Sequence, residues 1–130
     1  MRFRIELFVE DLDRSIRFYK RALGFELGRR EPDYASLRRG DAELGLGPIA
    51  KLPAHATGPG FTQDRLADSD RRGAGVEIVL EVEDVDAAFE AVRGAGWAVA
   101  EPLRARPWGL RDFRLPDPDG YYLRVTTRAD

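Results

Sequence analysis

The sequence predicts an α+β fold built from two tandem βαβββ modules whose facing sheets form a pocket. Three observations support this prediction. Residues 8–13 (FVEDLD) recur as residues 81–86 (EVEDVD), an offset of 73 positions. A helical pattern that ends at a glycine follows each copy, and alternating apolar and polar residues on both sides of each helix indicate strands.

Apolar and polar residues alternate through residues 4–9, which predicts the first strand of module one. Asp11 is a suitable N-cap for the helix that follows, and Gly24 is a left-handed stop. Beyond the stop an extended segment begins, and two more strands are expected at about 34–38 and 42–46.

The second half repeats this order. Alternation through residues 76–82 predicts a strand, and an aspartate again precedes the helix, which should end near Gly94 or Gly96. After another extended segment, two strands are expected at about 112–115 and 121–126. Each half therefore has the order β-α-β-β-β.

The segment between the halves is rich in Gly, Pro, Ala and Asp and has little periodicity. It is either a linker along the surface or a loop over the pocket, anchored by Ile49, Phe61 and Leu66. The expected boundaries are about 1–47 for module one, 48–75 for the loop and 76–130 for module two, within a single domain of residues 1–130.

Composition excludes several classes of protein. With a formal net charge of -2 the chain has no basic field to attract nucleic acid, so no nucleic-acid partner is expected. Without cysteine there can be no disulfides and no thiolate metal sites. No apolar stretch is long enough to span a membrane, so we expect a cytoplasmic protein with no membrane partner.

Several short motifs carry a family resemblance. Residues 9–13 (VEDLD) open the first helix, and Leu23–Phe25 (LGF) follows its end, while residues 107–113 (PWGLRDF) precede residues 117–120 (DPDG). Together with the repeated unit, these motifs resemble the vicinal-oxygen-chelate superfamily of glyoxalase I, extradiol dioxygenases, fosfomycin-modifying enzymes and bleomycin-binding proteins. The later motifs are similar to the bleomycin-resistance-like branch. The resemblance implies a cup-shaped, partly open β-barrel.

The resemblance also implies a divalent cation held by His or Glu at four positions, on the first and last strand of each module. In this sequence those positions are Arg4, Gly45, Glu77 and Arg124. Arginine stays protonated and glycine has no side chain, so only Glu77 could bind a metal. We therefore expect no metal site and no cofactor, and no catalytic residue is identified.

A charge cluster takes the place of the metal. If the family geometry holds, Arg4, Glu77 and Arg124 converge in the cup, with Glu6 and Glu81 further along the same faces. One interpretation is a network of salt bridges that joins the two halves. The other is an anchor for a carboxylate, a phosphate or another polar group of a small ligand.

Aromatic residues add to this site. Trp108 lies between a proline and a glycine, which favours a turn in which the indole lines the pocket or contacts a partner chain, with core packing as the alternative. Tyr122 should share the cup side with Arg124, two positions later. Trp97, expected to open a strand, matches Phe25 of the first half, and both are expected in the core.

Two other features have simpler explanations. Asp117 and Asp119 alternate with proline and glycine, which favours a hairpin turn over a carboxylate pair for chemistry. His55, the single histidine, is interpreted as an exposed loop residue.

The predicted function is metal-independent binding of a small antibiotic-like, aromatic or anionic molecule, of the bleomycin-resistance type. The resemblance implies a homodimer in which Trp108 of one chain could close over the cup of the other. The alternative is an enzyme, a glyoxalase-like lyase or dioxygenase with a non-standard metal site or none, and a third possibility is an interaction module. The predicted ligand-binding residues are Arg4, Glu6, Glu77, Trp108, Tyr122 and Arg124.

Overall fold

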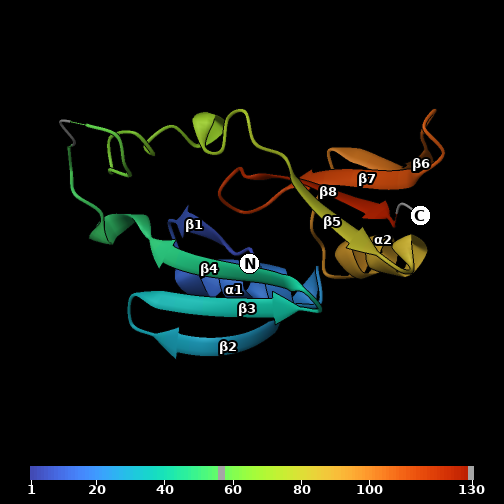
Figure 1. Cartoon of the computed structure of the whole chain (residues 1–130), viewed down its shortest axis with the longest axis horizontal. Helices are drawn as coiled ribbons and strands as arrows, with labels where there is room; N and C mark the ends of the chain where they lie inside the picture. The colour runs from blue at the N-terminus through green and yellow to red at the C-terminus, as the bar shows by residue number, and fades with distance from the viewer. Residues whose placement is uncertain (56–57, 129–130) are drawn as a thin grey trace.

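The computed structural model describes residues 1–55 and 58–128, and it contains two copies of one βαβββ module (Figure 1). The first module consists of β1 (Ile5–Val9), α1 (Leu12–Arg21), β2 (Glu26–Glu31), β3 (Tyr34–Arg39) and β4 (Ala42–Pro48). The second consists of β5 (Ile78–Val82), α2 (Val85–Gly94), β6 (Glu101–Ala105), β7 (Arg111–Pro116) and β8 (Tyr122–Thr127). The predicted order of elements is confirmed.

The two sheets have the same topology. Their strand orders are β1-β4-β3-β2 and β5-β8-β7-β6, with the first pair of each sheet parallel and the others antiparallel. Ile5 lies opposite Leu44, and Ile78 lies opposite Leu123, so the two halves also share one register. Neither sheet closes into a barrel within the described residues, and the two remain separate in Figure 1, as expected for a cup-shaped tandem fold.

Both helices begin and end as the sequence predicts. The Asp11 side chain accepts a hydrogen bond from the Arg14 amide, and Asp84 accepts one from the Ala87 amide, so both aspartates are N-caps. Beyond the C-termini, Gly24 has a φ of 70° and the corresponding glycine of module two also has a positive φ. Neither described helix is long and apolar enough to cross a membrane.

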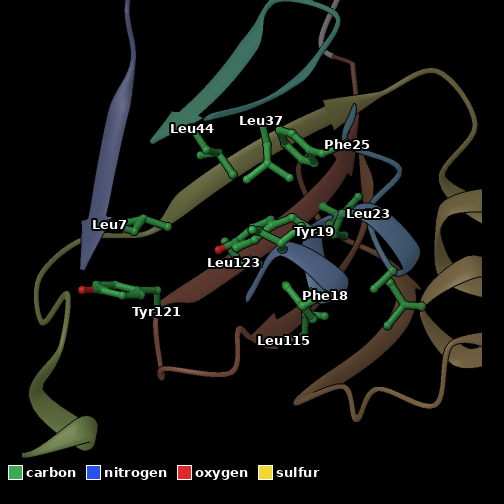
Figure 2. Packing of buried hydrophobic residues seen from close by; sticks show 14 of the residues in the cluster. Leu7, Phe18, Tyr19, Leu23, Phe25, Leu37, Leu44, Leu115, Tyr121 and Leu123 are labelled. Atoms are coloured by element: carbon green, nitrogen blue, oxygen red, sulfur yellow. The ribbon is translucent and has the colours of Figure 1, made fainter. Parts of the chain in front are cut away.

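One hydrophobic core joins the modules. Phe18 of α1 meets the ring of Trp97 edge-on at 4.9 Å between centroids, and Tyr19 meets Phe25 at 5.7 Å. Figure 2 shows Phe18 and Tyr19 of module one among leucines from both sheets. The predicted core positions of Trp97 and Phe25 are confirmed. The expected strand start at Trp97 is wrong, because β6 begins only at Glu101 after an irregular segment.

The segment between the modules contains two short 3-10 helices, Ile49–Lys51 and Ser69–Arg71. Phe61 from this segment packs on the ring of Phe8, with 4.4 Å between centroids, although it remains 58% exposed. The segment therefore contacts the side of β1 that faces away from α1, where the predicted pocket begins.

Candidate functional site

Each sheet has one face covered by its helix and one face turned away from it, which we call the open face. Alternation along the strands decides which side chains belong to each. The first open face carries Arg4, Glu6, Phe8, Tyr34, Ser36, Arg38, Glu43, Gly45 and Gly47. The second carries Glu77, Val79, Glu81, Asp112, Arg114, Tyr122, Arg124 and Thr126.

The four metal-ligand positions of the superfamily occupy matching places on these faces. Gly45 lies opposite Glu6 in the first sheet, and Arg124 lies opposite Val79 in the second. A Cβ atom at Gly45 would overlap the Glu6 carboxylate and lie 2.6 Å from the Tyr34 hydroxyl, so Glu6 fills the space that a ligand at this position would need.

The residues present do not fit the metal of the superfamily. Arg4, Gly45 and Arg124 supply no donor atom, and Glu77 alone cannot hold a divalent cation. Elsewhere in the described parts of the chain, no group of three His, Cys, Asp or Glu side chains lies close enough to do so.

Polar contacts on the first open face stay within module one. The Nε atom of Arg4 lies 3.0 Å from the Glu6 carboxylate, which also accepts a hydrogen bond from the Tyr34 hydroxyl. The Arg29 guanidinium lies 5.0 Å from the centre of the Tyr34 ring. Burial and the nearby Glu6 carboxylate raise the pKa of Tyr34, so its hydroxyl keeps its proton.

The second open face contains a group of charged side chains of both signs. The Glu77 carboxylate lies 3.2 Å from Nε of Arg124 and 3.6 Å from Nη1 of Arg114. Both Nε atoms are inaccessible to solvent and have no hydrogen-bond partner in the described structure. Both guanidinium groups contact Glu77, and Nε of Arg114 also lies 3.4 Å from the Glu101 carboxylate and 3.8 Å from that of Asp112, so two arginines face three carboxylates.

The structure brings together only part of the predicted cluster. Glu77 and Arg124 are paired, whereas Arg4 pairs with Glu6, and no ion pair joins Arg4 to Glu77 in residues 1–55 and 58–128. Within one chain, this cluster therefore does not form a salt-bridge network between the halves. Each of these ion pairs joins two side chains of the same module.

Trp108 lies in the turn between β6 and β7 and is 54% exposed. The guanidinium of Arg106 lies 5.9 Å from the centre of its ring and is held by Asp112 at 2.7 Å and Glu101 at 2.9 Å. Core packing of Trp108 is thus excluded. Sequence reasoning missed Arg106, although its position two residues before Trp108 could have suggested a cation beneath the indole.

Tyr122 lies on β8 opposite Pro116, on the same open face as Arg124. Its predicted orientation is confirmed. His55 is exposed and lies 3.2 Å from the Asp64 carboxylate, in agreement with its interpretation as a loop residue.

Residues 117–120 form the expected hairpin connection, but they also join the two modules. Asp117 accepts a hydrogen bond of 2.7 Å from the Tyr19 hydroxyl, and Asp119 accepts one of 2.8 Å from the Glu10 amide. Arg72 pairs with Asp119 at 3.3 Å. We call Tyr19, Arg72, Asp117, Asp119 and Tyr121 the interface cluster.

The carboxyl groups of the interface cluster are buried. Burial raises the pKa of Asp117 to about 6, although hydrogen bonds from Tyr19 and from the amides of Asp119 and Tyr121 oppose the shift. The Tyr121 hydroxyl donates to the Phe8 carbonyl and accepts from the Phe8 amide. These contacts satisfy the backbone amide and carbonyl of Phe8 at the outer edge of β1.

Comparisons with known proteins support the same fold. TioX from Micromonospora sp. ML1 is 25% identical and superposes with a TM-score of 0.78, covering 99% of each chain. UcmS2 is 21% identical with a TM-score of 0.75, covering 98% of each chain, and this likeness is one of fold.

Two relatives by sequence are named as lyases. A probable lactoylglutathione lyase of Vibrio cholerae serotype O1 is 27% identical over 122 residues, which cover 90% of this chain and 83% of the relative. A probable chloroplastic lactoylglutathione lyase of Arabidopsis thaliana is 30% identical over 120 residues, covering 90% of this chain. The aligned part is 33% of the Arabidopsis protein, so the chain spans about a third of its length.

The family model of the Glyoxalase/Bleomycin resistance protein/Dioxygenase superfamily matches residues 3–125, nearly the whole chain. The repeated register and the two four-stranded sheets are consistent with that match. This chain belongs to the Glyoxalase/Bleomycin resistance protein/Dioxygenase superfamily.

Proposed function

We propose that this chain binds a small aromatic or anionic molecule, such as an antibiotic, through side chains alone and without a divalent cation. Sequestration of the ligand is then the function, as in the bleomycin-resistance type. The observation that carries the proposal is the set Arg4, Gly45, Glu77 and Arg124 at the superfamily's four metal positions, where two fixed positive charges disfavour a cation.

The second open face suits an anionic group. Arg124 contacts the Glu77 carboxylate, and Arg114 contacts Glu77, Glu101 and Asp112, so both guanidinium groups are held in place on this face. A ligand carboxylate or phosphate could accept from these guanidinium groups. The proposed ligand-binding residues are Arg4, Glu6, Glu77, Trp108, Tyr122 and Arg124.

We infer that a second copy of the chain closes the pocket. The ion pairs of the two open faces stay within their own modules, so each face is available to a facing sheet. The exposed Trp108, supported by Arg106, is placed to contact a ligand or a partner chain. Because the chain has no cysteine, a reducing compartment suits it, and we propose that it acts in the cytoplasm.

Metal analysis tests the proposal most directly. Dialysed protein is examined for bound metal by elemental analysis and titrated with Zn²⁺, Ni²⁺ and Mn²⁺ by calorimetry. The expected result is no stoichiometric metal and no tight binding. Stoichiometric metal that survives dialysis would contradict the metal-free site.

Ligand binding is tested through tryptophan fluorescence. In a Trp97→Phe background, emission reports Trp108 alone, since the chain has two tryptophans. Titration with bleomycin and with other aromatic antibiotics is expected to change this emission in a saturable way. A lack of response to the whole panel would favour a protein-interaction module instead.

A lyase is the second candidate, because both relatives found by sequence are named probable lactoylglutathione lyases. With no usable metal set, such an enzyme would need a carboxylate of the open faces, such as Glu77, as a general base. Formation of lactoylglutathione from methylglyoxal and glutathione, assayed with and without added Zn²⁺ or Ni²⁺, distinguishes this candidate. Turnover that Glu77→Gln abolishes would establish it.

A further inference from the structure

A cleft of about 790 Å³ lies between the two modules and reaches the second open face at Val79 and Glu81. One wall comes from the end of α1 and the hairpin between β3 and β4, and the other from β5 and α2. Its volume is within the range of small-molecule sites. The residues that matter here are Arg21, Phe25, Arg39, Ala42, Glu83, Ala87 and Ala91.

The internal repeat explains why this cleft exists. Because the modules share one register, each position of α1 has a counterpart on α2, and the counterparts Ala87 and Ala91 line the cleft beside module one. On the first side of this pseudo-symmetric interface, large side chains fill the space. Phe18 packs on Trp97, and the Tyr121 hydroxyl binds the backbone of Phe8.

On the second side the corresponding side chains are small. The offset of 73 residues between the helices places Ala91 where module one has Phe18, and Ala87 where it has Arg14. Ala42 lies opposite Arg39 in the hairpin between β3 and β4, and Tyr121 lies opposite Asp117 in the hairpin between β7 and β8. Ala42 is therefore the module-one counterpart of Tyr121. The cleft therefore lies where the second side has no counterpart of the Phe18 ring, the Tyr121 ring or the long Arg14 side chain.

The charge at the cleft is also reversed. The interface cluster buries Asp117, whereas its counterpart in module one is Arg39. Nη1 of Arg39 donates to the Leu23 carbonyl at 2.8 Å, which fixes the guanidinium at the wall. Neither Arg39 nor Arg21 forms an ion pair in the described part of the chain. The positively charged Arg39 therefore occupies the position at which module two has the buried carboxyl group of Asp117.

The opposite wall carries three acidic side chains, Glu81, Glu83 and Asp84, each of which has a partner within the protein. Glu83 pairs with Arg128 at 3.7 Å, much as Glu10 pairs with Arg72 on the filled side, and Asp84 caps α2. Phe25 lines the cleft at the place of Trp97 on the filled side, although the core buries all but 3% of it.

We propose that this cleft is a second ligand site, which takes a small aromatic acid whose ring replaces the missing Phe and Tyr rings and whose carboxylate or sulfonate pairs with Arg39. The ring lies between Phe25 and the alanines of α2. The proposal does not depend on the function of the open faces.

The test uses 2-naphthoate as the probe and calorimetry as the measurement, on the full chain. Ala91→Phe and Ala42→Tyr each restore the ring of the filled side, and each is expected to weaken naphthoate binding by about tenfold or more. Two variants at separate positions are used because either might disturb folding by itself, which thermal unfolding monitors. Unchanged affinity in both folded variants would overturn the proposal.

The charge requirement is tested separately. Arg39→Gln is expected to weaken naphthoate several-fold and to leave the neutral analogue 2-naphthalenemethanol unaffected. Arg17→Gln is the matched control, because Arg17 is an exposed arginine of helix α1 that does not line the cleft. Equal losses of naphthoate affinity in Arg39→Gln and Arg17→Gln would show that the net charge of the protein, and not Arg39 itself, controls binding. That result would overturn the proposed site.

A third comparison locates the bound probe. Arg124→Leu removes a charge from the second open face, so it weakens any naphthoate bound there, whereas the component of binding that Ala91→Phe removes is expected to remain. Loss of binding in Arg124→Leu, without loss in Ala91→Phe, would place the probe on the open face and overturn the cleft site. The absence of any naphthoate binding to the unchanged protein at about 1 mM would do so as well.

Discussion

Gly45 shows how a single residue determines the chemistry that a superfamily site can support. Its missing side chain leaves room for the Glu6 carboxylate, which binds both Arg4 and Tyr34. At this position the glycine is required by close approach, since its backbone conformation is an ordinary extended one.

Gly45→Ala is expected to destabilise the protein by about 1–3 kcal/mol, because the new Cβ atom displaces the Glu6 carboxylate and contacts the Tyr34 hydroxyl. Denaturant unfolding measures the change. Gly47→Ala is the control, since a Cβ atom there would lie 3.5 Å from Phe8, an ordinary contact. Equal losses for both variants would show that crowding at Glu6 is not the cause.

Arg124→Leu is expected to separate binding from stability. Its side chain is about a quarter exposed, and Arg114 remains beside Glu77, so unfolding should change by less than about 1 kcal/mol. Affinity for an anionic ligand identified by the Trp108 titration should fall about tenfold or more. A large loss of stability with unchanged affinity would assign Arg124 a structural role.

At the scale of elements, the hairpin between β7 and β8 does more than reverse the chain. It places Asp117 and Asp119 against α1, where they bind Tyr19 and Ser15. A carboxyl group that is buried in this way makes stability depend on pH.

The pKa of Asp117 is raised from an ordinary value of 3.8 to about 6. Between these values the carboxyl group keeps its proton in the folded chain and loses it in the unfolded chain. Stability therefore falls as the pH rises from about 4 to about 6, by up to about 3 kcal/mol, and this term is constant above that window. Tyr19, Asp119, Tyr121 and Arg72 are the other ionisable groups of the interface cluster.

Asp117→Asn is expected to flatten the fall in stability between about pH 4 and pH 6, because an amide accepts the same backbone hydrogen bonds without titrating. Urea unfolding across this range measures the slope. Asp86→Asn is the control: hydrogen bonds from Arg111 lower the pKa of Asp86, so its stabilisation is lost as the pH falls. An unchanged slope in Asp117→Asn would contradict the prediction.

The sequence predicted most elements and could not predict this interface. Strand alternation, the caps at Asp11 and Asp84 and the glycine stops are local signals, and the structure confirms them. The residues around Asp117, with a proline and a glycine close by, are those of an ordinary turn, and they do not indicate that its carboxyl group is buried. Its burial arises from Tyr19, which lies 98 residues earlier, and no local pattern reports such a contact.

At the scale of the whole molecule, the sequence predicted which positions of the two modules correspond. It did not predict which side chains of the open faces form ion pairs with one another. The repeat identified Arg4, Gly45, Glu77 and Arg124 as matching positions, which the strand pairing supports. Which side chains meet depends on how the modules pack, and within one chain Arg4 pairs with Glu6 and not with Glu77.

The separate open faces predict a homodimer. Light scattering after size exclusion is expected to give twice the 14.6 kDa of one chain, because a facing sheet must come from a second copy to close each pocket. Weaker ligand binding on dilution should accompany dissociation. A monomer that binds its ligand with one-to-one stoichiometry would contradict this assembly.

The arrangement around Gly45 also bears on whether the superfamily's metal chemistry could be regained. Gly45→Glu by itself would place two carboxylates in the volume that Glu6 now fills, beside the Tyr34 hydroxyl. Replacing Arg4 first would leave Glu6 without its ion-pair partner. Engineering, or an evolving lineage, therefore has no favourable single step toward a metal centre, and several replacements must occur together.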